Sequence, residues 1–173
     1  SFAQERLWFL NEFEGSNENY NIPIILRLEG KLDIKSLKSS LNQLIARHAS
    51  FRTVFTKDKA GVGVQKILDK LELKLVAEKL DNKAKGKALE RIIKAEINKE
   101  ISTPFDFVKG PLIRVRLFEA PDSSHRETAL MQSHAQHIFV LNHHHIISDG
   151  VSIDIILKEL SEFYQANLEK REP

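Results

Sequence analysis

The apolar positions of this chain follow two periods, one typical of helices and one typical of strands. Apolar residues three and four positions apart mark a helix, whereas alternation or a short continuous run marks a strand. On this basis the sequence predicts helices over residues 1–10, 33–47, 83–101 and 151–168. It predicts strands over residues 21–29, 51–55, 64–68, 73–79, 112–118 and 138–145, with a polar turn at 122–127. Residues 128–136 follow neither period.

The segment from Ile138 to His145 begins with a nearly continuous apolar run, which is typical of a strand covered on both faces. Helices and strands alternate along the chain, and no repeat, low-complexity tract or linker divides it. We therefore predict one α/β unit over residues 1–173, with this strand inside the sheet. In the first helix, Trp8 and Phe9 are interpreted as core residues.

Candidate chemistry lies at the end of this run, in Asn-His-His-His-Ile-Ile-Ser-Asp-Gly at 142–150. If the strand continues to His145, then His143 and His145 share one face and His144 points to the other. Imidazole titrates near neutral pH, so the cluster is a candidate for acid/base chemistry or metal ligation, and a packed core histidine is the plain alternative. Ser148-Asp149-Gly150 predicts a tight turn before a helix, which brings a base, a carboxylate and free amides together.

Composition and charge narrow the classes of partner. Lysine and arginine number 26 and aspartate and glutamate 24, and this net charge of +2 gives no reason to expect nucleic acid or a membrane surface as a partner. The chain has no apolar run long enough to span a bilayer and no signal peptide, and it lacks cysteine, so a cytoplasmic location is expected. Because it starts without a methionine, we expect it to be a segment of a longer protein.

Three segments resemble the first three motifs of nonribosomal peptide synthetase condensation domains. They are residues 1–10, 47–55 and 144–152, and the third contains the His-His-x-x-x-Asp-Gly pattern of that family. The connecting text is also similar, notably Tyr-Asn-Ile-Pro at 20–23. Ala49 and Phe51 depart from the usual second motif, which puts local packing rather than chemistry in doubt, and the family gives no role for His143.

The resemblance implies a chloramphenicol-acetyltransferase-like lobe, a two-layer α+β sandwich whose mixed central sheet is packed with helices. It covers only the amino-terminal lobe of a domain in which two lobes face each other across a tunnel. The implied activity is that of an acyltransferase, amide-bond formation between donor and acceptor thioesters. The implied partners are upstream and downstream peptidyl carrier proteins and the carboxyl-terminal lobe. The phosphopantetheine arms belong to those carriers, and no cofactor bound by this lobe is expected.

The resemblance also implies roles for individual residues. His145, the second histidine of the motif, faces the tunnel, and the amide of Gly150 faces the thioester carbonyl. His144 is a buried hydrogen-bonding residue. Asp149 is structural and pairs with Arg47, or with Arg52 as the second candidate.

Elementary acid/base chemistry limits what His145 has to do. An α-amino group has a pKa of about 7.7–8.0 and is already substantially neutral near pH 7.5. Holding amine and thioester together can contribute more than removing a proton, up to about 7–11 kcal/mol. We therefore expect His145 to position the amine by a hydrogen bond and to accept its proton, rather than to act as a strong base.

Several alternatives stay open. Within the superfamily these are epimerisation and starter-acylation domains. Heterocyclisation domains are disfavoured, because they carry aspartates in place of the histidines. The features at 7–10 and 20–21 favour condensation of two L-configured residues. Outside it, the chain is a non-catalytic docking module, or a metal-binding hydrolase using His143, His145 and Asp149. The hydrolase pattern His-x-His-x-Asp-His is not matched here. The lobe alone is expected to lack turnover, because the tunnel needs both lobes.

Overall fold

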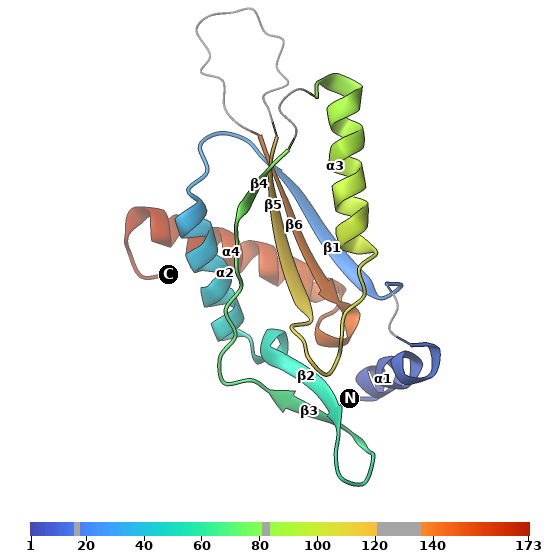
Figure 1. The fold of residues 1–173 in the computed structure, drawn as a ribbon. Helices are drawn as coiled ribbons and strands as arrows, with labels where there is room; N and C mark the ends of the chain where they lie inside the picture. Colours follow the sequence, from blue (N-terminus) through green and yellow to red (C-terminus); the bar gives the residue numbers. More distant parts are fainter. Residues whose placement is uncertain (16–17, 81–83, 121–135) are drawn as a thin grey trace, which may run out of the picture.

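The computed structural model describes residues 1–15, 18–80, 84–120 and 136–173 (Figure 1). Its helices are α1 (Phe2–Glu14), α2 (Ile34–Arg47), α3 (Gly86–Ile101) and α4 (Gly150–Glu169), with 3-10 turns η1 (Ala49–Arg52) and η2 (His145–Ile147). Its strands are β1 (Asn21–Leu28), β2 (Thr53–Lys57), β3 (Gly63–Ile67), β4 (Ala77–Lys79), β5 (Ile113–Ala120) and β6 (Gln136–His144).

A mixed four-stranded sheet in the order β1-β6-β5-β4 forms the centre of the fold. Strands β4 and β5 are parallel, and the other neighbours are antiparallel. Helix α3 covers one face of the sheet and helices α2 and α4 cover the other (Figure 1), while β2 and β3 pair separately. The predicted α/β class and mixed sheet are confirmed. Helices on both faces give one layer more than the two-layer arrangement expected.

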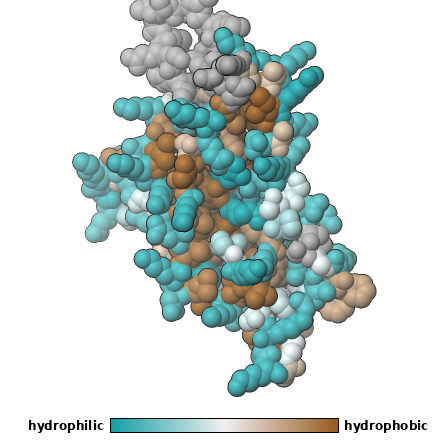
Figure 2. Space-filling view, viewed as in Figure 1, coloured by the Kyte–Doolittle hydropathy of each residue, from teal (hydrophilic) through white to brown (hydrophobic). Residues whose placement is uncertain are grey.

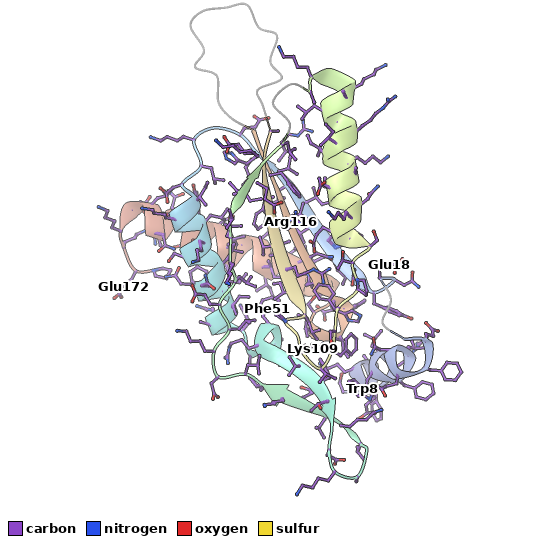
Figure 3. The ribbon with its side chains drawn as sticks, in the orientation of Figure 1. Trp8, Glu18, Phe51, Lys109, Arg116 and Glu172 are labelled. Atoms are coloured by element: carbon purple, nitrogen blue, oxygen red, sulfur yellow. The ribbon has the colours of Figure 1, made fainter. Side chains whose placement is uncertain are left out.

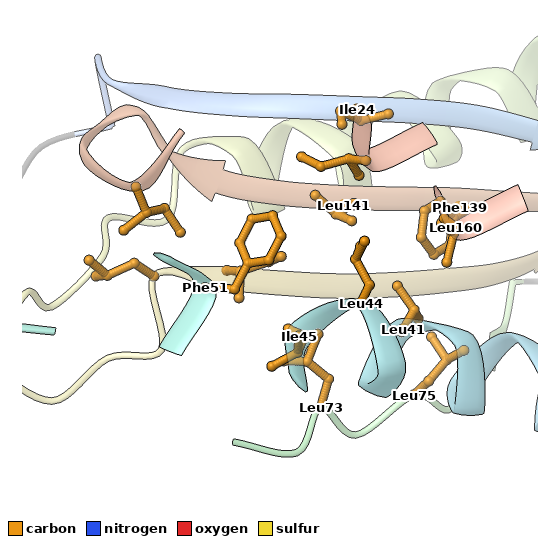
Figure 4. Packing of buried hydrophobic residues seen from close by; sticks show 14 of the residues in the cluster. Ile24, Leu41, Leu44, Ile45, Phe51, Leu73, Leu75, Phe139, Leu141 and Leu160 are labelled. Atoms are coloured by element: carbon orange, nitrogen blue, oxygen red, sulfur yellow. The ribbon is translucent and has the colours of Figure 1, made fainter. Parts of the chain in front are cut away.

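Strand β6 connects two hydrophobic clusters because its side chains alternate between the faces of the sheet. Phe139 and Leu141 point into the larger cluster, where they meet Leu44 of α2 (Figure 4). Val140 belongs to the second cluster, with Leu89 of α3. The inner, doubly covered strand predicted from the apolar run is therefore confirmed. Figure 2 shows hydrophilic side chains around the rim of this view and apolar ones gathered along its middle. No described helix is both long and apolar enough to cross a membrane.

Helix α1 is longer than the sequence predicts, because it continues past residue 10 to Glu14. Trp8 packs against Phe55 and Phe107, with ring centroids 6.4 and 6.1 Å away, so its interpretation as a packing residue is confirmed (Figure 3). Phe9 is 64% exposed and stacks on Phe13, so its interpretation as a core residue was wrong. One residue turns the helix by about 100°, which carries Phe9 off the face that Trp8 packs.

Two strand predictions change in extent. The segment predicted as a strand at 51–55 starts as η1, and β2 begins at Thr53. The strand predicted at 73–79 is reduced to β4, because the Leu73 amide donates to Asn42 Oδ1 of α2 at 2.8 Å rather than to a strand. Its alternating apolar residues pack against a helix instead. The predictions at 122–127 and the start of the helix at 83 lie outside the described residues.

Candidate active site at the end of strand β6

The histidine run leaves the sheet one residue earlier than the sequence predicts. Strand β6 ends at His144, and His145 begins the 3-10 turn η2. The His145 amide donates to the carbonyl oxygen of Tyr20 at 2.9 Å, and the Ser148 amide donates back to the His145 carbonyl at 3.4 Å. Within the turn, the Ile146 amide donates to Nδ1 of His144 at 3.0 Å. The chain therefore bends at His145, and its imidazole does not share a strand face with that of His143.

The ring of His145 is exposed, and one of its two nitrogens is already hydrogen-bonded within the protein. Its Nδ1 lies 2.8 Å from the carbonyl oxygen of Ser148. Because a carbonyl oxygen can only accept, Nδ1 must carry the hydrogen, and in the neutral ring the lone pair is then on Nε2. The turn thus selects the tautomer that presents a hydrogen-bond acceptor and proton acceptor at Nε2.

His145 lies in the wall of an open hollow of about 430 Å³ between α1 and the amino end of α4. The hollow brings together segments that are far apart in the sequence: the start of the chain, the η1 turn, the η2 turn and the first turn of α4. Its lining residues are Ser1, Ala3, Gln4, Leu7, Ser50, His145, Ile146, Ile147, Ser148, Asp149 and Ser152.

The other two histidines are buried. His144 is 3% exposed, accepts the Ile146 hydrogen bond and meets the Phe107 ring edge-on at 4.6 Å, as a buried hydrogen-bonding residue should. His143 is fully buried, and neither ring nitrogen has a hydrogen-bond partner among the described residues. Burial, and secondarily the charge of His145, lowers the pKa of each buried ring to about 4. Both rings are therefore neutral at physiological pH, and only His145 faces the hollow.

Asp149 caps helix α4 and forms no ion pair with either predicted arginine. Its Oδ1 accepts from the Ser152 hydroxyl at 2.7 Å and from the Ser152 amide at 3.0 Å, and its own amide donates to the Ser152 hydroxyl. The Ser152 hydroxyl and then its amide hold the pKa of the Asp149 carboxyl below its ordinary value. The carboxylate is exposed and bonded to Ser152, so the predicted pairing of Asp149 with Arg47 or Arg52 was wrong.

The two arginines have other partners. Arg47 lies 3.3 Å from a carboxylate oxygen of Glu159 on α4, and His48 contacts the other oxygen of that group at 2.6 Å. Arg52 donates to the carbonyl oxygens of Leu68 at 2.5 Å and Ile45 at 3.3 Å. Arg47 therefore links α2 to α4, and Arg52 satisfies carbonyl groups at the end of α2 and after β3.

The described residues around His145 do not provide a set of side chains that could bind a metal ion. Among the described residues, no three histidine, aspartate or glutamate side chains lie close enough together to hold one ion. His143 is inside the core and His145 is at the surface, so the geometry separates the two imidazoles that the hydrolase reading brings together.

Sequence reasoning missed a second set of polar contacts beneath the sheet. Glu100 of α3 is 5% exposed, and Nε of Arg114 on β5 lies 2.6 Å from its carboxylate. The Arg114 guanidinium also donates to the Thr103 carbonyl at 2.6 Å and stacks over the Phe105 ring at 3.7 Å. These partners lie on different elements, and no local pattern pairs them.

Gln4 was also missed. Its Nε2 donates to the carbonyl oxygen of Ile146, in the turn that carries His145, at 3.0 Å. A signal was available locally, because Ser1 and Gln4 form the capping box of α1. The long-range contact had no signal in the sequence.

The fold and the site together define an α/β unit of the chloramphenicol-acetyltransferase-like kind, with a histidine turn at the end of an inner strand. The model of the condensation-domain family matches residues 1–173. The chain belongs to this family, and the predicted resemblance is confirmed.

Similar sequences and similar solved structures come from peptide synthetases and related biosynthetic domains. The chain is 39% identical to malpibaldin synthetase of Mortierella alpina over 166 residues, and 35% identical to gramicidin S synthase 2 of Brevibacillus brevis over 167 residues. Each match covers 96% of this chain, but only 3% of the length of either relative. The starter condensation domain of rhizomide synthetase superposes with a TM-score of 0.81 at 21% identity, over 100% of this chain and 38% of that one. The X-domain in its complex with OxyB from teicoplanin biosynthesis gives 0.77 at 25% identity, over 99% and 33%.

Proposed function

We propose that this chain is the amino-terminal lobe of a peptide synthetase condensation domain and supplies the histidine at which an amide bond forms. The observation that carries the proposal is the hydrogen bond from His145 Nδ1 to the Ser148 carbonyl, which leaves the Nε2 lone pair free on a residue that lines the 430 Å³ hollow. An acceptor aminoacyl thioester placed there would find a hydrogen-bond acceptor for its amine.

The reaction needs little from the protein beyond position and one proton acceptor. The acceptor amine attacks the donor thioester carbonyl, a C–N bond forms, the C–S bond breaks, and the donor arm leaves as a thiolate. Nε2 of His145 holds the amine, takes the proton released from the nitrogen and returns it to the thiolate. General acid/base help of this kind contributes about 10²–10⁴-fold, and correct placement of the two reactants contributes more.

The amino end of α4 supports the charge that develops on the carbonyl oxygen. Gly150 is the first residue of that helix, and the first N–H groups of any helix have no partner inside it. They carry the positive end of the helix dipole. The Gly150 amide is our candidate for stabilising the oxyanion.

The proposal includes the partners and the limits of this lobe. The substrates arrive on phosphopantetheine arms of an upstream and a downstream carrier protein, and the preferred pairing is an L-configured donor with an L-configured acceptor. The hollow is open, so we propose that a second lobe closes it and that the lobe alone does not turn over.

Loaded carrier proteins test these statements. Donor and acceptor carriers are mixed with the condensation domain that contains this chain, and the acceptor carrier is analysed by intact-protein mass spectrometry. We expect a dipeptidyl thioester, its loss in His145→Gln, and its retention in His48→Gln, which removes an imidazole outside the hollow. The 173-residue chain by itself should form none. A racemised aminoacyl thioester would indicate epimerisation instead, and full activity of His145→Gln would refute the assignment.

A further inference from the structure

Gln4 extends from helix α1 to the turn that carries His145. Its Nε2 donates to the Ile146 carbonyl at 3.0 Å, across 142 positions of sequence. Its Oε1 accepts from Gln65 Nε2 of β3 at 2.8 Å and from the Ser1 hydroxyl at 3.3 Å. These donors fix the orientation of the carboxamide, because its oxygen must face them and its nitrogen must then face the carbonyl.

Both backbone polar groups of Ile146 are hydrogen-bonded, one by α1 and the other by β6. The carbonyl is held directly by Gln4, and the amide is held by Nδ1 of His144 at 3.0 Å. The His144 ring packs on Phe107, which packs on Trp8 of α1. Ile146 is 2% exposed, so a carbonyl released there would lose a bond in a place where water replaces it poorly.

The turn defined in this way determines how His145 is presented. His145 precedes Ile146, and the carbonyl that accepts from His145 Nδ1 belongs to Ser148, two residues beyond Ile146. A shift of the Ile146 peptide therefore moves the ring and its acceptor relative to each other. The 2.8 Å contact between them depends on the turn staying in place.

We propose that Gln4 is a positioning residue for His145: by holding the Ile146 carbonyl, it maintains the turn that puts the hydrogen on Nδ1 and the lone pair on Nε2. Its consequence for turnover rests on the proposed function, but the tautomer is a property of this chain alone. The two can therefore be tested separately.

Imidazole nitrogen NMR of the 15N-histidine-labelled chain tests the proposal without any substrate. Spectra are recorded at about pH 8, above the ordinary imidazole pKa of about 6.5, and His145→Gln identifies the signal. We expect His145 to be mainly Nδ1–H in the unsubstituted chain. In Gln4→Met, which keeps the length and loses the donor, the ratio of Nδ1–H to Nε2–H should fall about fivefold, the factor that one net hydrogen bond of about 1 kcal/mol represents.

Gln65→Met is the matched control. It removes a bond to the same carboxamide but leaves Nε2 of Gln4 on the Ile146 carbonyl, so the His145 tautomer should not change. A merely structural role of Gln4 would lower the melting temperature and leave the tautomer of the folded protein unchanged, which would overturn the proposal. If Gln4→Met fails to fold by circular dichroism, Gln4→Asn, one methylene too short to reach, should show the same shift.

Turnover gives the second measurement. In the condensation domain containing this chain, Gln4→Met should lower kcat about tenfold with KM for both loaded carriers within about twofold, because a displaced catalytic group affects the chemical step more than binding. An unchanged kcat alongside a changed tautomer would overturn the catalytic half of the proposal. Absence of amide formation in the unsubstituted domain would refute the proposed function, and the NMR ratio would still decide the role of Gln4.

Discussion

Acidification should destabilise this protein through the two buried imidazoles of strand β6. His143 and His144 have pKa values of about 4 in the fold, against an ordinary value of 6.5. Between these values the unfolded chain binds protons that the folded chain does not, so the free energy of unfolding falls as the pH drops below 6.5. Above pH 6.5 the stability is fully present. At about pH 5 each ring should have lowered the free energy of unfolding by about 2 kcal/mol, because one pKa unit corresponds to about 1.36 kcal/mol.

His143→Leu separates this effect from the rest of the acid response. Leucine fills an apolar site without ring nitrogens to protonate, and His143 has no hydrogen-bond partner to lose among the described residues. Urea unfolding followed by circular dichroism, at constant salt between about pH 5 and pH 8, gives the free energy of unfolding for each variant. The decline of the wild type towards pH 5 should exceed that of His143→Leu by about 2 kcal/mol.

His145→Leu serves as the control, because it removes an exposed imidazole from the same run and should keep nearly the full decline. A wild type whose unfolding free energy is flat over this range would refute the reasoning. So would a His143→Leu variant that declines as steeply as the wild type.

Two further predictions concern polar contacts. Asp149→Ala should lower the urea midpoint, because it removes the cap of α4. Asp149→Asn, which can still cap, and Arg47→Ala should keep a midpoint close to that of the wild type. A strongly destabilised Arg47→Ala would indicate that Arg47 pairs with Asp149 after all. Arg114→Met should cost about 1.5–3 kcal/mol, because it removes the 2.6 Å hydrogen bond to the buried Glu100 carboxylate while Arg116 Nη1 stays 3.7 Å from that group. Arg114→Met combined with Glu100→Gln should recover much of that loss in the same urea assay, and a double variant no more stable than the single one would contradict the assigned pair.

Some of the site was within reach of the sequence. The apolar run placed β6 inside the sheet, and the family resemblance implied the burial of His144. The start of α4 directly after Asp149 followed from Ser148-Asp149-Gly150, but the turn before it is η2, three residues earlier than predicted. The family followed from three ordered motifs and is confirmed by the match over the full 173 residues.

The rest depended on contacts between distant elements. The residue at which β6 ends could not be predicted from the sequence, because the His145 amide donates a hydrogen bond to the carbonyl of Tyr20, which is far away in the sequence. Asp149 was expected to need an arginine, but Ser152, three residues on, already satisfies it. Buried Glu100 and its partner Arg114 lie on a helix and a strand that only packing brings together.

By itself, the sequence determined the order and type of most elements, the inner strand and the segment that carries the candidate site. Periodicity, caps and turns depend on residues within about four positions of one another, so they can be predicted from the sequence alone. The tertiary structure decided which histidine faces the hollow, which nitrogen carries its hydrogen, and that Gln4 holds the turn from 142 residues away. Those outcomes depend on how α1, β1 and α4 meet around His145, which no local pattern encodes.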